Sequence, residues 1–146
     1  RGMVPGNKLI RFETITPGPD IAKELQLEDG EKVFYVERIR YADDKPMALE
    51  KTYLPVKLFP QLSQETFTGS LYSLIEQEQQ LKISHASQRM EAALVKPEEA
   101  ELLQIQVPSA ILLIERASYL TNGQPFEVVR SIYRADRYKF ISEIQR

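Results

Sequence analysis

Two segments of the chain each show the pattern strand, tight turn, strand, and no other feature limits the possible folds as strongly. The first turn is formed by Asp43-Asp44-Lys45-Pro46, and the second is marked by Asn122-Gly123, a dipeptide typical of tight β-hairpins. The flanking segments are rich in β-branched and aromatic residues, which favour strands. We therefore expect two antiparallel hairpins, with strands over residues 32–42, 47–54, 110–120 and 126–133.

The rest of the chain alternates between helical patterns and further strand patterns. Pro17-Gly18-Pro19-Asp20 opens a helix that we expect to run through Leu27 and to end at Gly30. Ser70 is placed to cap a second helix, and Pro97 is placed to begin a third. Further strands are predicted over residues 9–15 and 83–94. This order predicts one α+β domain over residues 1–146, in which helices pack against an antiparallel sheet.

The two predicted hairpins resemble each other in sequence. Residues 37–41, Glu-Arg-Ile-Arg-Tyr, parallel residues 115–119, Glu-Arg-Ala-Ser-Tyr, and Lys51-Thr52 then parallels Arg130-Ser131. A sheet built by duplication explains this match, whereas two similar hairpins also arise by chance. Both explanations stay open at the level of the sequence.

Composition excludes several classes of active site. The chain has no cysteine and one histidine, so disulfides, thiolate chemistry and two-histidine metal sites are impossible. No glycine-rich phosphate loop occurs, and His85 lies in a polar strand pattern typical of a surface residue. We therefore expect no catalytic residues, no metal and no cofactor. The net charge of −2 predicts no DNA binding by this chain alone, and the lack of a long apolar stretch predicts no membrane span. The absence of cysteine fits a reducing compartment, so we expect a cytoplasmic protein.

Two arginines inside a predicted strand are the most informative charged residues. Arg38 and Arg40 continue an otherwise apolar strand face, on which they lie ~7 Å apart. A guanidinium on a half-buried face needs an anionic partner, and its fork matches carboxylate or phosphate oxygens. The partner is either a bound anion or an internal carboxylate, for which Glu50, Glu115 and Glu127 are candidates. A further alternative is that the two arginines lie on an exposed edge and need no such partner.

A helix N-terminus and a second strand face add further polar groups. Backbone N–H groups at the helix start near Ser70 offer an anion site, and Tyr72 lies in the first turn of the same helix. Glu127 and Tyr133 share one face of the last strand, where they present an acceptor and a phenol. A purely structural explanation remains for the helix, in which Ser70 caps it and Tyr72 packs against the core.

Short motifs follow one another in a characteristic order along nearly the whole chain. They are Val36-Glu37-Arg38-Ile39-Arg40-Tyr41, Asp44-Lys45-Pro46-Met47-Ala48-Leu49-Glu50, Tyr53-Leu54-Pro55, Ser70-Leu71-Tyr72, Ile114-Glu115-Arg116, Gly123-Gln124-Pro125-Phe126-Glu127 and Tyr133-Arg134-Ala135-Asp136-Arg137-Tyr138-Lys139-Phe140. This series resembles the effector-binding domain called UTRA, for UbiC transcription regulator-associated. UTRA domains are found in GntR-type bacterial repressors of the HutC subfamily.

The resemblance implies a chorismate-lyase-like fold, a homodimer formed through this domain, and an N-terminal winged helix-turn-helix domain that binds operator DNA and is absent from this chain. Residues 1–6 also resemble those of members that respond to amino-sugar phosphates. In those members the positions of Arg38, Arg40, Ser70 and Tyr72 contact the phosphate, whereas those of Glu50, Glu127 and Tyr133 face the sugar.

The predicted function is that of a sensor domain in a transcription repressor. The resemblance implies a small-molecule effector, glucosamine 6-phosphate or N-acetylglucosamine 6-phosphate, and no enzymatic activity. The alternative is an enzyme of the chorismate-lyase type that cleaves an anionic substrate in the same pocket. A third hypothesis, a purely structural dimerisation module, leaves Arg38 and Arg40 paired internally.

Overall fold

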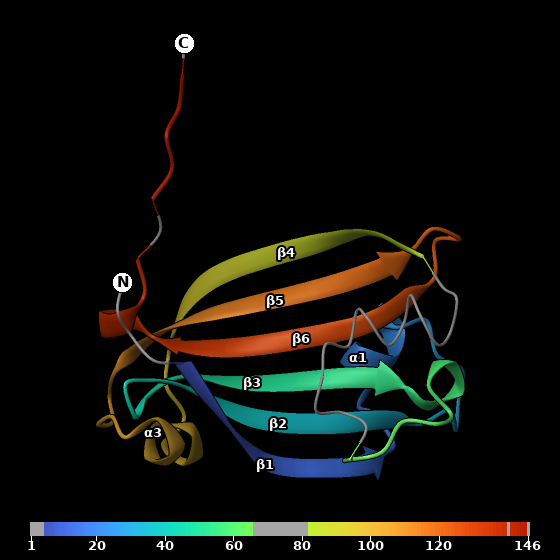
Figure 1. Cartoon of the computed structure of the whole chain (residues 1–146), viewed down its shortest axis with the longest axis horizontal. Helices are drawn as coiled ribbons and strands as arrows, with labels where there is room; N and C mark the ends of the chain where they lie inside the picture. The colour runs from blue at the N-terminus through green and yellow to red at the C-terminus, as the bar shows by residue number, and fades with distance from the viewer. Residues whose placement is uncertain (1–4, 66–81, 140, 146) are drawn as a thin grey trace.

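One antiparallel sheet organises the molecule. The computed structural model describes residues 5–65, 82–139 and 141–145, and within these residues six strands lie in the order β1-β2-β3-β6-β5-β4 (Figure 1). The strands are β1 (Pro5–Ile15), β2 (Val33–Ala42), β3 (Lys45–Pro55), β4 (Ile83–Leu94), β5 (Ala110–Leu120) and β6 (Pro125–Arg134). Every pairing is antiparallel, so the predicted α+β class and both predicted hairpins are confirmed.

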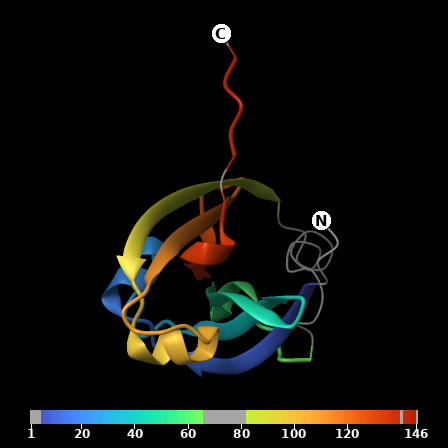
Figure 2. The same ribbon diagram turned by 90° about the vertical axis from the view of Figure 1, so that its left-hand side faces the viewer.

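The two described α-helices pack on the same face of the sheet, at opposite ends of its strands (Figures 1 and 2). They are α1 (Pro19–Glu24) and α3 (Pro97–Leu103), and short 3-10 turns η1 (Val56–Leu58) and η4 (Ala135–Arg137) follow β3 and β6. We call the side of the sheet that carries both helices the helix face. None of the helices among the described residues is long and apolar enough to cross a membrane.

The sheet has the arrangement that a duplication predicts. Each half contains a strand, a helix and a hairpin, and the halves meet where β3 pairs with β6. Equivalent residues of the two hairpins also occupy equivalent places, since Glu37 lies opposite Lys51 and Glu115 lies opposite Arg130. The sequence match between the hairpins therefore reflects a real correspondence in structure.

The first helix is shorter than its sequence pattern predicts. α1 ends at Glu24, and Gln26 takes the left-handed conformation with a φ of 55°. The backbone N–H of Leu27 then donates to the carbonyl of Ala22 at 2.8 Å, a bond that closes a helix end around a left-handed residue. The prediction that Gly30 ends this helix was wrong, because Gln26 adopts the backbone conformation that glycine usually provides.

Three hydrophobic clusters stabilise the sheet, and polar side chains lie between them. On the helix face, Ile21 of α1 and Leu25 just after it pack against the sheet, and Leu103 of α3 packs against the sheet at the other end. A third cluster surrounds Phe34 and Leu54 on the opposite face, near one end of the strands. Several buried polar side chains lie between these clusters in the middle of the strands, Glu37 and Glu115 on the helix face and Glu50 and Ser131 on the opposite face.

Candidate functional site

The face opposite the helices brings together most of the residues predicted to bind a ligand. Arg38 lies directly opposite Glu50, which lies opposite Ser131, and residues paired in this way share one side of a sheet. We call this side, which carries Arg38 and Arg40, the arginine face. Strand alternation adds the remaining predicted residues of β2 and β6 to it. The face holds Arg38, Arg40, Glu50, Glu127 and Tyr133.

Two of the predicted phosphate contacts cannot be placed. Ser70 and Tyr72 lie outside the described residues, so their assignment to the site remains a prediction.

Arg38 and Arg40 converge on one carboxylate. Nη2 of Arg38 donates to Oε1 of Glu50 at 2.7 Å, and Nη1 of Arg40 donates to Oε2 of Glu50 at 3.3 Å. The Glu50 side chain is 11% exposed, whereas those of Arg38 and Arg40 are 28% and 48% exposed. The internal pairing that the sequence left open is thus realised with Glu50. The cluster keeps a formal charge of +1 and presents its cationic side outward.

Glu127 is the most deeply buried carboxyl group of the arginine face, at 5% exposure. Ser118 Oγ donates to its Oε1 at 3.2 Å, and Nη2 of Arg116 lies 3.6 Å from the same oxygen. Burial raises the pKa of Glu127 above the ordinary range, the charge of Arg116 opposes this rise, and the nearby Glu50 adds to it. The buried Glu127 carboxyl group therefore favours a ligand that offers it hydrogen-bond donors or a positive charge.

Tyr133 supplies a phenol at the end of the face where η4 begins. The residue lies opposite Ala48 on β3, and its ring meets that of Tyr138 edge-on, with 5.0 Å between the ring centroids. Burial raises the pKa of the Tyr133 phenol, and the charge of Glu50 raises it further. The hydroxyl is therefore protonated at neutral pH and both donates and accepts hydrogen bonds.

Arg116 and Ser118 of β5 belong to the same face but were not selected from the sequence. Ser118 lies opposite Glu127, and Arg116 reaches the same carboxylate from two residues away. The Nε atom of Arg116 is buried and has no hydrogen-bond partner within the described part of the chain. The sequence does contain a pattern that points to Arg116, because Arg116 occupies in the second hairpin the place that Arg38 takes in the first.

Comparison with known proteins identifies the family. The model of the UTRA domain matches residues 1–139. The chain belongs to the UTRA family. It is 38% identical over 146 residues to the HTH-type transcriptional repressor NagR of Bacillus subtilis, covering 100% of this chain and 60% of that protein. It is 33% identical to the mannosyl-D-glycerate transport/metabolism system repressor MngR of Escherichia coli, covering 96% of this chain and 58% of MngR.

A solved structure supports the same conclusion for the fold. The effector domain of PhnF from Mycobacterium smegmatis superposes with a TM-score of 0.88 at 29% sequence identity, covering 99% of this chain and 90% of that one. The expected chorismate-lyase-like fold of a UTRA effector-binding domain is thereby confirmed. The chain spans about 60% of the length of the curated relatives NagR and MngR.

Proposed function

We propose that this UTRA domain is the sensor of a transcription repressor and binds a phosphorylated sugar, glucosamine 6-phosphate or N-acetylglucosamine 6-phosphate. The observation that carries the proposal is the convergence of Arg38 and Arg40 beside Glu50, on the same face as Glu127 and Tyr133. The β2 side of this face carries the two arginines, and the β6 side offers a buried acid and a phenol, as a ligand with one anionic and one polar end requires.

The phosphate is proposed to bind at the two arginines. Guanidinium groups carry five N–H donors in a rigid fork, and the contact with Glu50 uses one donor of Arg40. The Arg40 side chain is 48% exposed, which leaves it accessible to a ligand from solvent. Ser70 and Tyr72, which match phosphate-contacting positions of the family, are proposed to complete this end of the site.

The sugar is proposed to lie over Glu50, Glu127 and Tyr133. Glu127 is held by Ser118 and Arg116, so its carboxyl group has a fixed place at which to accept a hydrogen bond from a hydroxyl or amino substituent. The name of MngR, a relative 33% identical to this chain, refers to mannosyl-D-glycerate, and this supports a sugar-derived effector.

The remaining parts of the proposal concern the whole repressor. An N-terminal winged helix-turn-helix domain outside this chain is proposed to bind operator DNA, and the effector to control that binding. The domain itself is proposed to form a homodimer, to act in the cytoplasm and to catalyse no reaction. The names of the relatives, a transcriptional repressor in one case and a transport and metabolism repressor in the other, support this assignment.

A thermal-shift comparison tests the proposal. Glucosamine 6-phosphate and N-acetylglucosamine 6-phosphate are expected to raise the melting temperature, because a ligand that binds only the folded state stabilises it. Unphosphorylated glucosamine at the same concentration is expected to have much less effect. Chromatography of the bound sugar after incubation should recover it unchanged. Conversion into a new product would instead support the enzyme of the chorismate-lyase type.

A further inference from the structure

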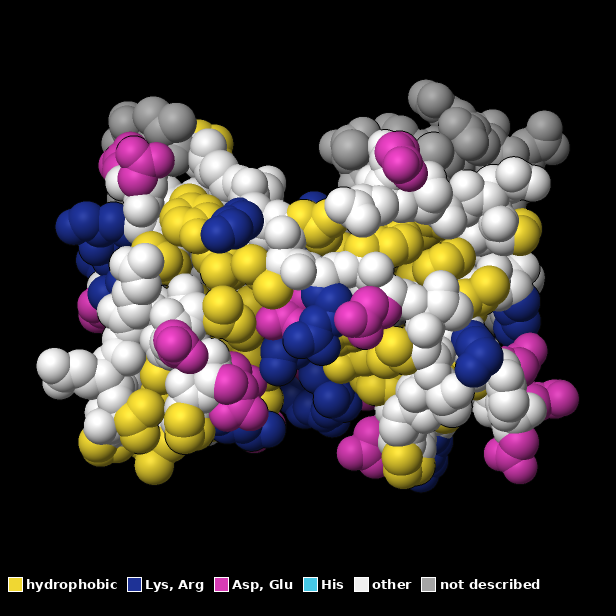
Figure 3. Space-filling model, turned by 90° about the horizontal axis from the view of Figure 1, so that it is seen from below, with side chains coloured by type: hydrophobic (Ala, Val, Ile, Leu, Met, Phe, Trp, Pro, Cys, Tyr) yellow, Lys and Arg dark blue, Asp and Glu magenta, His cyan; other side chains and the backbone are white. Residues whose placement is uncertain are grey.

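One row of charged side chains crosses the helix face from one edge of the sheet to the other. Its members lie opposite one another in the registers of the five strand pairs, and they are Arg11, Glu37, Lys51, Arg130, Glu115 and Arg89. Viewed from below, where β1 forms the edge of the sheet, basic side chains bordered by acidic ones gather between two lobes of the molecule (Figure 3). Two basic residues, Lys51 and Arg130, meet at the centre of this row.

Lys51 and Arg130 place two positive charges directly opposite each other on neighbouring strands, an arrangement that destabilises a sheet. Each is held by an acid on its own side. Nζ of Lys51 donates to Oε2 of Glu99 on α3 at 3.2 Å, whereas Nε of Arg130 donates to Oε2 of Glu115 at 2.5 Å. The side chains of Lys51 and Arg130 are only 25% and 33% exposed, so solvent screens their repulsion incompletely. An anion bound between the two cations would remove this repulsion.

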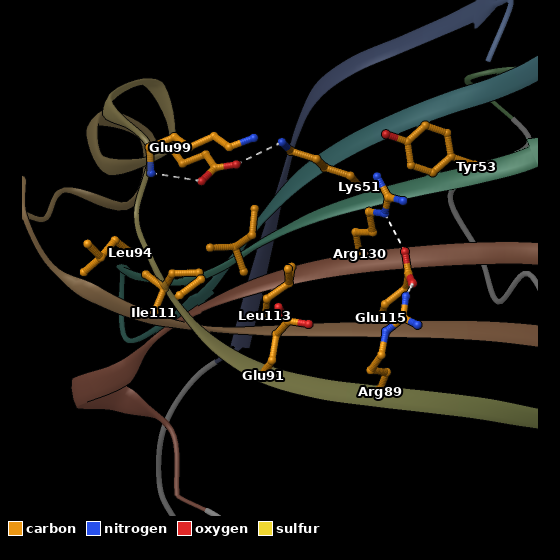
Figure 4. Close-up of a pocket in the computed structure, with 13 residues that line it drawn as sticks. Lys51, Tyr53, Arg89, Glu91, Leu94, Glu99, Ile111, Leu113, Glu115 and Arg130 are labelled. Carbon is orange, nitrogen blue, oxygen red and sulfur yellow. Dashed lines mark hydrogen bonds and ion pairs between the residues drawn. The ribbon is translucent and has the colours of Figure 1, made fainter. Parts of the chain in front are cut away.

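A cavity of about 280 Å³ begins at this pair and has an apolar floor. Ile132 of β6 lies opposite Leu113 of β5, and Ile111 lies two residues before Leu113 on the same face. Figure 4 shows Leu113 and Ile111 beyond Arg130, toward the end of the sheet at which Glu99 of α3 lies. The cavity therefore joins two cations to an apolar surface.

The charges around the cavity select a ligand with one negative charge. Four basic and three acidic side chains line it, so one positive charge is in excess. Burial alone would raise the pKa of Glu115, one of these acids, but the hydrogen bond from Arg130 and the charges of Arg130 and Arg89 hold it below the ordinary range. Glu115 therefore stays charged and repels a second negative charge. A carboxylate meets this requirement better than a phosphate dianion does.

The donors of Arg130 and the size of the cavity define the ligand further. The contact with Glu115 uses Nε of Arg130, and within the described part of the chain the Nη groups keep their donors for a carboxylate. A cavity of ~150 Å³ holds one benzene molecule, so this larger one holds a ligand of ~10 non-hydrogen atoms.

We propose that the helix face binds a small monocarboxylic acid with an apolar body. The carboxylate lies between Lys51 and Arg130, and the apolar body lies over Leu113, Ile132 and Ile111. We call this the helix-face site. It goes beyond the proposed function, because the proposed sugar-phosphate site lies on the opposite face of the same strands.

Calorimetry with three matched probes tests the class of ligand. The carboxylate probe is 3-phenylpropanoate, for which we expect a dissociation constant of ~1 mM or below. Its neutral analogue 3-phenylpropan-1-ol and the bare anion acetate should each bind at least ~10-fold more weakly, because the first lacks the charge and the second lacks the apolar body. Equal binding of the alcohol, or no binding of 3-phenylpropanoate at ~10 mM, would overturn the proposal.

Substitutions locate the bound probe. Lys51→Met and Arg130→Met each remove one cation of the helix-face site and should weaken the binding of 3-phenylpropanoate ~10-fold. Ala93→Phe fills the cavity without changing a charge and should weaken binding as much, which keeps the test valid if a charge variant does not fold. Lys57→Met is the matched control and should bind as the wild type does, because it removes a lysine paired with Glu31 outside the cavity.

The Arg38→Ala, Arg40→Ala double variant distinguishes the two proposed sites. It should bind 3-phenylpropanoate as the wild type does, and glucosamine 6-phosphate should not compete with this probe. Loss of probe binding in the double variant, together with full binding by Lys51→Met and Ala93→Phe, would place the probe on the arginine face and overturn the helix-face site. A protein that binds 3-phenylpropanoate but no sugar phosphate would refute the proposed function and still support the helix-face site.

Discussion

Replacing Glu50 by glutamine separates the internal role of the arginine cluster from its proposed ligand. In the free protein the Glu50 carboxylate accepts from Arg38 at 2.7 Å and from Arg40 at 3.3 Å. A charge-assisted hydrogen bond of the first kind contributes ~1.5–3 kcal/mol, and the more exposed Arg40 pair contributes ~0.2–1 kcal/mol. Glutamine keeps one neutral acceptor, so we expect a net loss of ~1–2 kcal/mol, or ~2–8 °C in melting temperature.

The same substitution is expected to strengthen the binding of a bare anion. Glu50→Gln raises the formal charge of the cluster from +1 to +2, and a unit charge ~6 Å from another contributes ~3 kcal/mol at an effective dielectric constant of ~20. Solvent around the half-exposed Arg40 reduces this value to ~1.4 kcal/mol, so we expect inorganic phosphate to bind ~10-fold more tightly at low ionic strength and added salt to weaken the effect. Inorganic phosphate is the right probe because it makes no sugar contacts. Thermal shift in phosphate-free buffer measures the loss of stability, and calorimetry with phosphate measures the gain in affinity.

Glu13→Gln is the matched control for this experiment. Oε2 of Glu13 lies 3.7 Å from Nε of Arg11 in an exposed ion pair on β1. Loss of this ion pair should lower the free energy of unfolding by less than ~0.5 kcal/mol and leave phosphate binding unchanged. The reasoning is refuted if Glu50→Gln melts at the wild-type temperature, or if its affinity for phosphate is equal to or weaker than that of the wild type.

Two further predictions concern a buried acid and a turn. The pKa of Glu127 is raised in the folded state, so the folded protein binds a proton at this carboxyl group more tightly than the unfolded chain does. Glu127 therefore lowers the stability of the protein as pH rises from the ordinary carboxyl range through the raised pKa. As pH rises across this range, the melting temperature of Glu127→Gln should increase relative to that of the wild type. A difference in melting temperature that stays constant with pH would contradict the burial argument. Gly123 has a φ of 88° in the β5–β6 turn, where alanine is strained, so Gly123→Ala should lower the free energy of unfolding by ~1 kcal/mol. A denaturant titration measures this loss, and an unchanged free energy of unfolding would show that alanine is tolerated there.

The strands and turns could be predicted because their signals are local. Alternating side chains and β-branched residues define β2, and Asp43 and Asp44 form its turn with φ values of 52° and 64°, a conformation that aspartate tolerates. The alternation of β2 also places Arg38 and Arg40 on one face, as expected. Signals of this kind need no knowledge of which strands become neighbours.

The partner of the two arginines could not be predicted, because it depends on register. Three carboxylates were equally suitable in sequence, and Glu50 is selected because β3 pairs with β2 in a register that places Arg38 opposite it. A bulge next to Arg40 shifts the pairing by one residue toward the turn, and composition does not reveal this shift. The contact of Arg116 with Glu127 also depends on register, because it joins two strands whose pairing is known only from the structure, although the repeated hairpin pattern pointed to Arg116 itself.

The proposed sugar-phosphate site is tested most directly by calorimetry of glucosamine 6-phosphate against unphosphorylated glucosamine, on this chain and on a version extended upstream of Arg1. Each charge-assisted hydrogen bond contributes ~1.5–3 kcal/mol, so Arg38→Ala or Arg40→Ala should weaken binding of the phosphorylated sugar by ~10- to 150-fold with the fold intact. The account predicts that the wild type binds glucosamine 6-phosphate far more tightly than glucosamine, and that the Arg38→Ala, Arg40→Ala double variant loses this preference. Equal affinity for the two sugars, or full binding by the double variant, would contradict it.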